Sequence, residues 1–334
     1  DLEIKLDPSK KTFDNITQEF KARYDLEVNL TNIGEATAYG SEIGTLSTPN
    51  GISSNSTTVS CGDLPNGSSC STVVGVNVTA SANIGNRSLF TPGGWTNPDF
   101  SSDSLSNVSR AWIKPNPVLK MTGEKISREV WWNDSTNITD LQVYGFGNVK
   151  LQYVDMSAPQ TALGDKNLLS QQYSFLNDGF NVSKGESKNA TLNLQIDRKG
   201  NHKIEVEANA TGNNCGPECV DTKEVTIDVY RKANLTFLNE TQVVMRDPID
   251  LQAKVENSES NGVSDYTVAF YDEGEHIANV STDGNGLAEV KWDATNESVG
   301  YHNLSARIWD NESKYYRKVG SGDRKSTRLN SSHY

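Results

Sequence analysis

The chemically competent motif that recurs most often in this sequence is Asn-x-Ser/Thr with x not proline, the acceptor of N-linked glycans. Nineteen such triplets occur, and the 34 asparagines and 61 serines and threonines in 334 residues would form roughly 6 by chance. This excess predicts a glycosylated, exported protein, and an unglycosylated asparagine-rich β protein is the alternative. The acceptors are Asn15, Asn29, Asn55, Asn66, Asn77, Asn86, Asn107, Asn133, Asn137, Asn181, Asn189, Asn209, Asn234, Asn239, Asn279, Asn296, Asn303 and Asn311, with a nineteenth triplet at Asn330.

The positions of these asparagines support the same interpretation. Around Asn29, Asn77 and Asn303, apolar residues alternate with polar ones, and the asparagine falls in the polar row. A period of two places alternate side chains on opposite faces of a strand. The acceptors are therefore expected on the solvated face, where a glycan has room.

Four cysteines form two local pairs, which predict disulfides between Cys61 and Cys70 and between Cys215 and Cys219. Closing the ten-residue loop of the first pair would stabilise the fold by roughly 2 to 3 kcal/mol on a chain-entropy basis. A zinc site is the alternative, but no histidine pair lies at ligand spacing near either cysteine pair.

Oxygen-rich turns make calcium the metal that this sequence favours, with weak candidate ligands Asp272, Glu273, Glu275 and Asp283. Aspartate and glycine also dominate turns for backbone reasons, and the D-x-D-x-D-G spacing is absent. No other cofactor is expected. The same acids could serve a glycosidase only if the fold placed two of them across a cleft.

No motif for a catalytic nucleophile, a phosphate-binding loop, a dinucleotide site or a zinc protease occurs in the chain, so a non-enzymatic protein is expected. Trp131 and Trp132 must point to opposite faces of a strand, one toward the core and one outward. An exposed tryptophan there, or Trp95 in the segment 93–98, could stack on a sugar ring. The alternative is that these side chains anchor loops.

The elements that carry these residues are short. Alternating stretches separated by Gly, Pro, Asn and Asp recur throughout, which predicts an all-β chain of three tandem immunoglobulin-like antiparallel β-sandwiches. A short helix is expected only near 161–172. Prolines in Ile113–Pro117 predict an extended linker. A second boundary is expected where a strand ends at Tyr230 and another starts at Ala233, which gives domains 1–114, 115–230 and 231–320.

Charge and hydropathy limit the partners. Acidic residues outnumber basic ones by 43 to 31, and a net charge of −12 without basic clusters argues against nucleic acid and anionic membranes. No run of eighteen apolar residues occurs, and the chain begins at Asp1 without a leader. We therefore expect a fragment or a processed form that meets a membrane only through an anchor outside this sequence.

Two segments carry family resemblances. Asn32, Gly34 and Ala38 at a strand end, followed by Leu64 and Gly67, resemble the immunoglobulin-like cell-adhesion-related domains of archaeal and bacterial surface proteins. Unit 231–320 is similar to the bacterial Ig-like repeats of adhesins and S-layer proteins, in its segments 266–274, 281–288 and 300–306. Unit 115–230 is expected to be a similar sandwich of uncertain subtype.

The final segment stands apart. Residues 323–333, DRKSTRLNSSH, match a translated frame of a common short-read sequencing adapter. We therefore expect 321–334 to be a non-native tail, and Asn330 to be no biological acceptor.

These patterns and resemblances imply an extracellular, N-glycosylated structural or adhesion segment of a larger prokaryotic, archaeal cell-surface protein. Its expected partners are other cell-envelope proteins or surface glycans. The alternative is an accessory spacer or carbohydrate-binding region of a secreted hydrolase.

Overall fold

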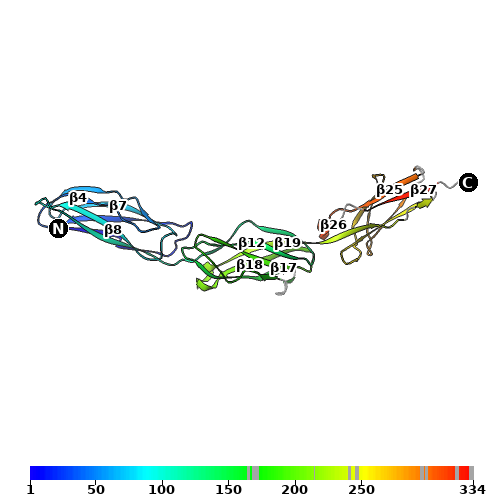
Figure 1. Ribbon diagram of the computed structural model, residues 1–334, viewed down its shortest axis with the longest axis horizontal. Helices are drawn as coiled ribbons and strands as arrows, with labels where there is room; N and C mark the ends of the chain where they lie inside the picture. The colour runs from blue at the N-terminus through cyan, green and yellow to red at the C-terminus, as the bar shows by residue number, and fades with distance from the viewer. Residues whose placement is uncertain are drawn as a thin grey trace.

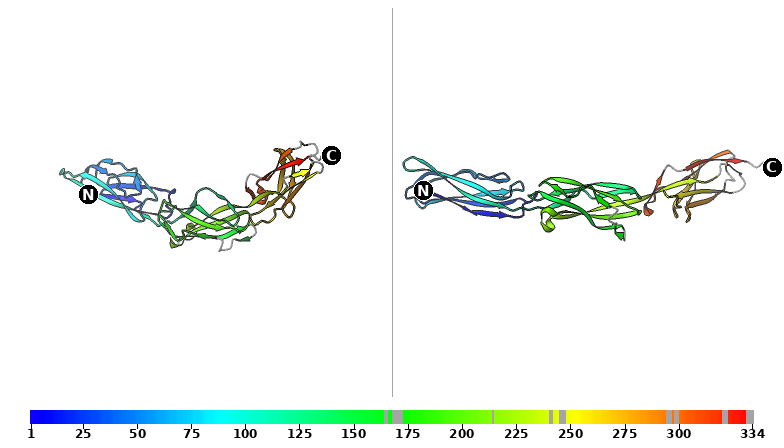
Figure 2. Two further views of the ribbon diagram at one scale, coloured as in Figure 1. Left: turned by 45° about the vertical axis from the view of Figure 1, so that its right-hand side comes forward. Right: turned by 60° about the horizontal axis from the view of Figure 1, so that its bottom comes forward.

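The computed structural model describes the chain except residues 164–165, 168–172, 214, 240–241, 245–247, 294–296, 298–299, 320–322 and 331–334. Three β-sandwich units follow one another along an elongated, gently bent rod, with the two termini at opposite ends (Figure 1). The two rotated views in Figure 2 show the same succession. Each unit has its own cluster of buried hydrophobic side chains.

The first unit contains two sheets, with strand orders β1-β3-β7-β5 and β2-β9-β8-β4-β6. All pairings are antiparallel except that between β2 and β9. The strands are β1 (Leu2–Asp7), β2 (Lys10–Phe13), β3 (Ala22–Asn32), β4 (Ala38–Ile43), β5 (Ile52–Ser54), β6 (Val59–Leu64), β7 (Ser69–Val78), β8 (Gly85–Thr96) and β9 (Ser102–Ile113).

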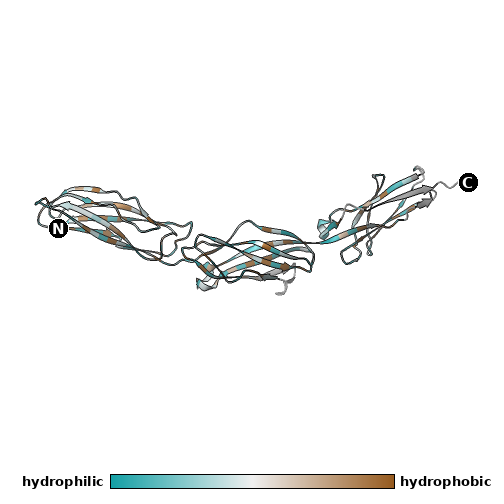
Figure 3. Cartoon of the chain, viewed as in Figure 1, coloured by the Kyte–Doolittle hydropathy of each residue, from teal (hydrophilic) through white to brown (hydrophobic). Residues whose placement is uncertain are grey.

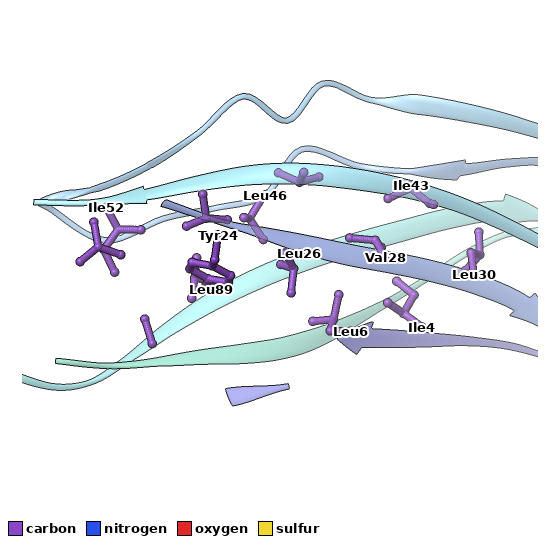
Figure 4. Close-up of a cluster of buried hydrophobic side chains, with 14 of the residues drawn as sticks. Ile4, Leu6, Tyr24, Leu26, Val28, Leu30, Ile43, Leu46, Ile52 and Leu89 are labelled. Carbon is purple, nitrogen blue, oxygen red and sulfur yellow. The ribbon is translucent and has the colours of Figure 1, made fainter. Parts of the chain in front are cut away.

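Strict alternation explains why this unit forms a sandwich. Along β3, Tyr24, Leu26, Val28 and Leu30 are buried, and the residues between them are exposed or half-buried. Figure 4 shows these side chains pointing into the space between the two sheets, where they meet Leu89 and residues of β1 and β4. Leu26 is completely buried, and truncating such a side chain to alanine typically costs about 2 to 5 kcal/mol.

The second unit pairs a sheet of order β10-β12-β17-β15 with one that contains β14-β13-β18-β19. Strand β11 joins β19 in parallel, and β16 joins β13. Its elements are β10 (Leu119–Thr122), β11 (Ile126–Trp131), β12 (Ser135–Gly145), β13 (Leu151–Leu163), β14 (Lys166–Asn167), β15 (Tyr173–Phe175), β16 (Phe180–Val182), β17 (Ser187–Gln195), β18 (Gly200–Ala210), the short 3-10 helices η1 (Thr211–Asn213) and η2 (Gly216–Cys219), and β19 (Val220–Phe237).

The third unit begins within the same strand. The second half of β19 pairs with β21 and β26, β21 pairs with β24, and the facing sheet has the order β20-β27-β25-β22-β23. Its further elements are β20 (Gln242–Val244), β21 (Ile249–Glu256), β22 (Thr267–Asp272), β23 (Glu275–Ser281), β24 (Leu287–Trp292), β25 (Gly300–Arg307), the 3-10 helix η3 (Glu312–Lys314), β26 (Tyr316–Val319) and β27 (Asp323–Asn330).

Two local predictions from the sequence differ from the structure. The helix expected near 161–172 is replaced, where the chain is described, by the end of β13 and by β14, and the rest lies outside the described residues. The strand break expected between Tyr230 and Ala233 does not occur, because β19 continues through Arg231 and Lys232. Cross-strand partners on both sides of this point keep the backbone extended.

The distribution of apolar and polar residues follows the two-layer architecture of each unit. Figure 3 shows apolar residues as short bands along the strands, separated by polar ones, as a two-layer sandwich with solvated outer faces requires. Among the described residues, no helix has the length and apolar character that crossing a bilayer requires. Paired antiparallel sheets around a shared core make each unit an immunoglobulin-like β-sandwich.

Candidate functional sites

The glycan acceptors predicted from sequence lie away from the three cores. Asn29, Asn209, Asn239 and Asn311 are half-buried, Asn296 lies outside the described residues, and the other acceptors are exposed. Three of the half-buried acceptors already use their side chains: the Asn29 Oδ1 accepts from the Thr31 hydroxyl at 3.2 Å, the Asn239 Nδ2 donates to the Asp250 carbonyl, and the Asn311 Oδ1 accepts from the Lys314 amide at 3.2 Å. Exposed acceptors therefore have the most room for a glycan.

Both predicted cysteine pairs are bonded in the structure. Cys61 and Cys70 link the facing ends of β6 and β7, and Cys215 and Cys219 close the turn that contains η2. In each pair the Cα atoms are 5.7 Å apart, a usual separation for a disulfide. These bonds close surface turns of the first and second units.

The three candidate tryptophans differ in exposure. Trp95 is buried at the end of β8, and its Nε1 donates to Asn97 Oδ1 at 2.9 Å, so it anchors the turn and offers no open ring to a sugar. Trp132 packs against the core of the second unit, and its Nε1 donates to the Asp197 carbonyl at 2.7 Å. Trp131 points outward and is 37% exposed.

The four weak calcium candidates lie in two separate turns. Asp283 Oδ1 accepts from the amides of Asn285 and Leu287, both at 2.8 Å, and these bonds lower the pKa of its carboxyl. Glu273 Oε1 accepts from the Asn303 amide at 2.9 Å, Glu275 is exposed, and Asp272 faces inward. Within the described chain these four acids are not brought together. The one group of three metal-ligand side chains found there is Asp272, Glu297 and His302.

The first junction joins two units through hydrogen bonds from amide groups to backbone carbonyls, together with a charged donor, Lys184 Nζ, which lies 3.3 Å from the Ala80 carbonyl oxygen. The Gln18 backbone amide donates to the Phe146 carbonyl and its Nε2 donates to the Gly147 carbonyl, both at 2.8 Å. The buried side chain of Asn148 donates from Nδ2 to the carbonyl of Lys114, the last residue of the first unit, at 2.9 Å, and its Oδ1 accepts from the Asn116 amide at 2.7 Å. A Cβ on Gly147 would lie 1.9 Å from the Asn116 carbonyl oxygen, so the start of the second unit packs closely against its own residues 147 and 148, beside the Gln18 contact.

The second junction is built on β19 and carries charge. Arg317 of β26 lies with its guanidinium 3.9 Å from the ring centroid of Tyr230, and it contacts Glu129 Oε1 of the second unit at 3.0 Å and Glu312 of the third. Arg231 stacks on Trp132, with its guanidinium 4.1 Å from the ring centroid. Stacked and paired arginines of this kind favour one fixed arrangement of the two units.

Protonation equilibria at this junction reflect those contacts. Burial, and then the hydrogen bond that the Tyr230 hydroxyl donates to Glu312 at 2.8 Å, raise the pKa of Tyr230 to about 12. The hydrogen bonds from Arg317 and Tyr230 lower the pKa of the Glu312 carboxyl. Burial, followed by the charges of Arg231 and Lys314, lowers the pKa of Lys199, which donates to the Lys314 carbonyl at 2.8 Å.

Three hollows flank the same junction. One of about 390 Å³ lies between β11 and β26, with Trp131, Tyr230, Asp310 and Arg317 in its wall. One of about 240 Å³ also has Trp131 and Tyr230 in its wall, and one of about 480 Å³ lies beside Lys199 and Tyr316. Trp131 is exposed and lines both of the first two hollows, so an aromatic ring borders two concave surfaces of the junction.

Sequence reasoning missed both junctions. Residues 18 and 147, or 129 and 317, are far apart in the chain, and no spacing rule joins them. One signal was present: Tyr230 directly precedes the basic pair Arg231 and Lys232, and the chain holds an aromatic pair at 131–132, a composition that suits cation–π stacking. Pairing them required knowledge that β11 lies beside β19.

Comparison with known proteins gives matches in fold only. No family model and no curated protein matches the chain. Solved structures that match include the ICAM-5 D1-D4 ectodomain fragment, at 8% identity over 99% of this chain and 77% of that chain with a TM-score of 0.43. Others are invasin, a bacterial integrin-binding protein, at 10% over 99% and 60% with a TM-score of 0.38, and the Clostridium thermocellum CbhA fibronectin(III)-like modules, at 13% over 65% and 98% with a TM-score of 0.26.

Proposed function

We propose that this chain is a non-enzymatic, extracellular rod of a cell-surface protein that carries adhesion or envelope contacts at a fixed distance and orientation. The observation that carries the proposal is the pair of built junctions, because each of them holds neighbouring sandwiches in one relative position. A flexible linker would leave the units free to rotate. Partners in this role are other envelope proteins or surface glycans.

The domains of this proposal are 1–114, 115–230 and 231–320, with 321–334 as a non-native tail whose residues 323–330 occupy a strand position beside β25. Three separate hydrophobic clusters support the division. Sequencing the source locus across codon 321 tests the tail, and native codons for 323–333 would refute its origin in an adapter. Further Ig-like units and an anchor beyond that point would support the surface role, whereas an adjoining hydrolase domain would make the chain an enzyme's spacer.

Dense N-glycosylation of an archaeal surface protein is the second part of the proposal. It is supported by the threefold excess of acceptor triplets and by the position of every described acceptor outside the buried core. A glycan cover together with acidic side chains keeps sheet edges and faces from pairing with other chains. Glycans on Asn66, at the tip of an exposed turn, and on Asn137 are expected first.

The test uses the native protein in its source cells. Intact cells are treated with a protease that does not enter them, and released peptides are analysed by mass spectrometry for hexose-bearing Asn66 and Asn137. Release of glycosylated peptides from intact cells is expected. Recovery of unmodified peptides only after lysis would contradict both the location and the modification.

A carbohydrate-binding role is the second candidate, and exposed Trp131, which lines two hollows, is the observation that favours it. Sugar rings stack on such aromatic faces. The Trp131→Ala variant, with Trp95→Ala as the buried control, should lose binding on a glycan array if this role is real. No binding by the unaltered chain would remove this candidate.

A further inference from the structure

Three potential metal ligands converge at the far end of the third unit, away from the second junction. Asp272 is the last residue of β22, His302 lies near the start of β25, and Glu297 belongs to the connection that leads into β25. Asp272 is directly opposite Leu304 across the two strands. His302 is therefore the diagonal neighbour of Asp272 on the same inward face, within reach of a long side chain.

The geometry of the cluster is compact. One ligand atom from each of the three side chains lies within 4.8 Å of the others. His302 Nδ1 lies 2.8 Å from Asp272 Oδ2, and the ring centroids of His302 and Trp292 are 5.9 Å apart. His302 and Asp272 are 4% and 9% exposed, whereas Glu297 is exposed, so a buried pair faces one longer carboxylate side chain at the surface.

A second observation points to a missing ligand. Asp272 Oδ1 is buried, and no hydrogen-bond donor in the described part of the chain reaches it. A buried carboxylate oxygen without a hydrogen-bond partner destabilises the fold, because it has lost its hydrogen bonds to water and no protein group replaces them. The contact with His302 satisfies only the other oxygen. A cation bound beside Asp272 would remove this cost.

We propose that Asp272, Glu297 and His302 form a binding site for a divalent transition-metal ion, with Zn²⁺ as the best-matched ion. One imidazole nitrogen and two carboxylate oxygens are ligands that zinc accepts at about 2.0 to 2.2 Å. Calcium prefers six to eight oxygens, and an imidazole ligand disfavours it. Three protein ligands leave the fourth tetrahedral position to water or to an atom of another molecule.

Closing the site requires only a small adjustment. Ligand atoms around a tetrahedral ion with bonds near 2.1 Å lie about 3.4 Å apart. The 2.8 Å contact between His302 Nδ1 and Asp272 Oδ2 would open by a few tenths of an ångström as the ion replaces the proton between them, and the exposed Glu297 side chain can cover the remaining distance by rotating about its own bonds. This site goes beyond the proposed rod function, since a rod segment needs no metal.

The test titrates the full chain with ZnCl2 by isothermal calorimetry, and with CoCl2 to read the visible absorption of a tetrahedral site. One ion per chain is expected. Glu297→Gln should weaken binding at least about tenfold, since loss of even an outer-shell partner typically costs 10- to 100-fold. This variant changes an exposed side chain, so its folding is not at risk. Asp272→Asn and His302→Gln should abolish binding.

Matched controls are His276→Gln and His333→Gln, which remove an exposed histidine of the same unit and the histidine of the tail. Both should bind as the unaltered chain does. Affinity unchanged in Glu297→Gln and His302→Gln, or lost in His276→Gln, would overturn the proposal. Calcium binding that persists in His302→Gln would also overturn it, because the site would then be an oxygen site.

Discussion

The two junctions of the rod hold neighbouring units in place by different chemistry. Between the first and second units, separate strands are joined by a short connection, and amide side chains and backbone groups make most of the contact, with Asn148 at its centre and Lys184 donating to the Ala80 carbonyl. Between the second and third units, one strand runs through, and arginines stacked on aromatic rings stabilise the sides. The first depends on amide and backbone hydrogen bonds beside a tightly packed start of the second unit, and the second on ion pairs and stacked aromatic rings.

The largest expected effect tests the tight packing of the second unit beside the first junction. Gly147→Ala places a Cβ against the Asn116 carbonyl and the Val118 amide, both of them backbone atoms that must move. Overpacking of this kind costs about 1 to 3 kcal/mol. Chemical denaturation should show this cost as a lower free energy of unfolding. The control Gly94→Ala, whose Cβ meets nothing closer than 3.7 Å, should change little, and equal losses in both would refute the close-contact account.

The next effect belongs to the charged junction. Arg317→Ala removes the stacking on Tyr230 and the pairs with Glu129 and Glu312, at a side chain that is 18% exposed. Because the pairs are partly solvated, the loss should be about 1 to 2 kcal/mol. Small-angle X-ray scattering should also show a broader range of maximum dimensions. Lys5→Ala, which removes a surface pair with Glu3 in the first unit, should leave both readings unchanged.

Alkaline pH should act on the second junction through Tyr230. A pKa raised to about 12 means that folding favours the protonated phenol. Its contribution is therefore complete below the ordinary value near 10, and is lost as the pH rises from about 10 to about 12. Tyr230→Phe should cost about 1 kcal/mol at neutral pH through the hydrogen bond to Glu312, and should make this alkaline decline shallower. Tyr153→Phe, at an exposed tyrosine, is the control, and an identical decline in both variants would argue against this role for Tyr230.

Raising the salt concentration should give the smallest difference between the two junctions. Raising NaCl from about 0.1 M to about 1 M shortens the screening length from about 10 Å to about 3 Å and weakens partly exposed pairs by less than about 1 kcal/mol. Hydrogen exchange of the Arg231 amide, which donates to the Tyr315 carbonyl at 3.0 Å, should quicken slightly. Exchange of the Gln18 amide at the first junction, where no ion pair joins the described residues of the two units, should stay constant. A larger salt response at Gln18 than at Arg231 would reverse the comparison.

The fold was predictable because alternation is a local signal. Leu26, Val28 and Leu30 indicate a half-buried strand without reference to anything distant, and the cysteine pairs are close in sequence. The continuity of β19 was not predictable, because Arg231 and Lys232 resemble a solvated linker until Trp132 is known to lie against Arg231.

The cluster at Asp272 escaped sequence reasoning for a similar cause. The calcium hypothesis grouped acids that are neighbours in the sequence, such as Glu273 and Glu275. His302 and Glu297 reach Asp272 only because β22 pairs with β25, and that pairing is not written in any local spacing.

The shared strand β19 also constrains how this protein can tolerate insertions and deletions. The β19 residues that enter the two cores all have odd residue numbers, so they lie on one face of the strand. They are Val225, Ile227 and Val229 in the second unit, and Ala233 and Phe237 in the third. A single residue inserted at 231–232 would turn the third unit's inward row outward, because side chains alternate with a period of two. Only insertions of even length keep both cores intact at this place. No strand is shared by two units at the connection after Ile113, so insertions of odd and of even length are both tolerated there. We therefore expect related genes to differ in length at this connection.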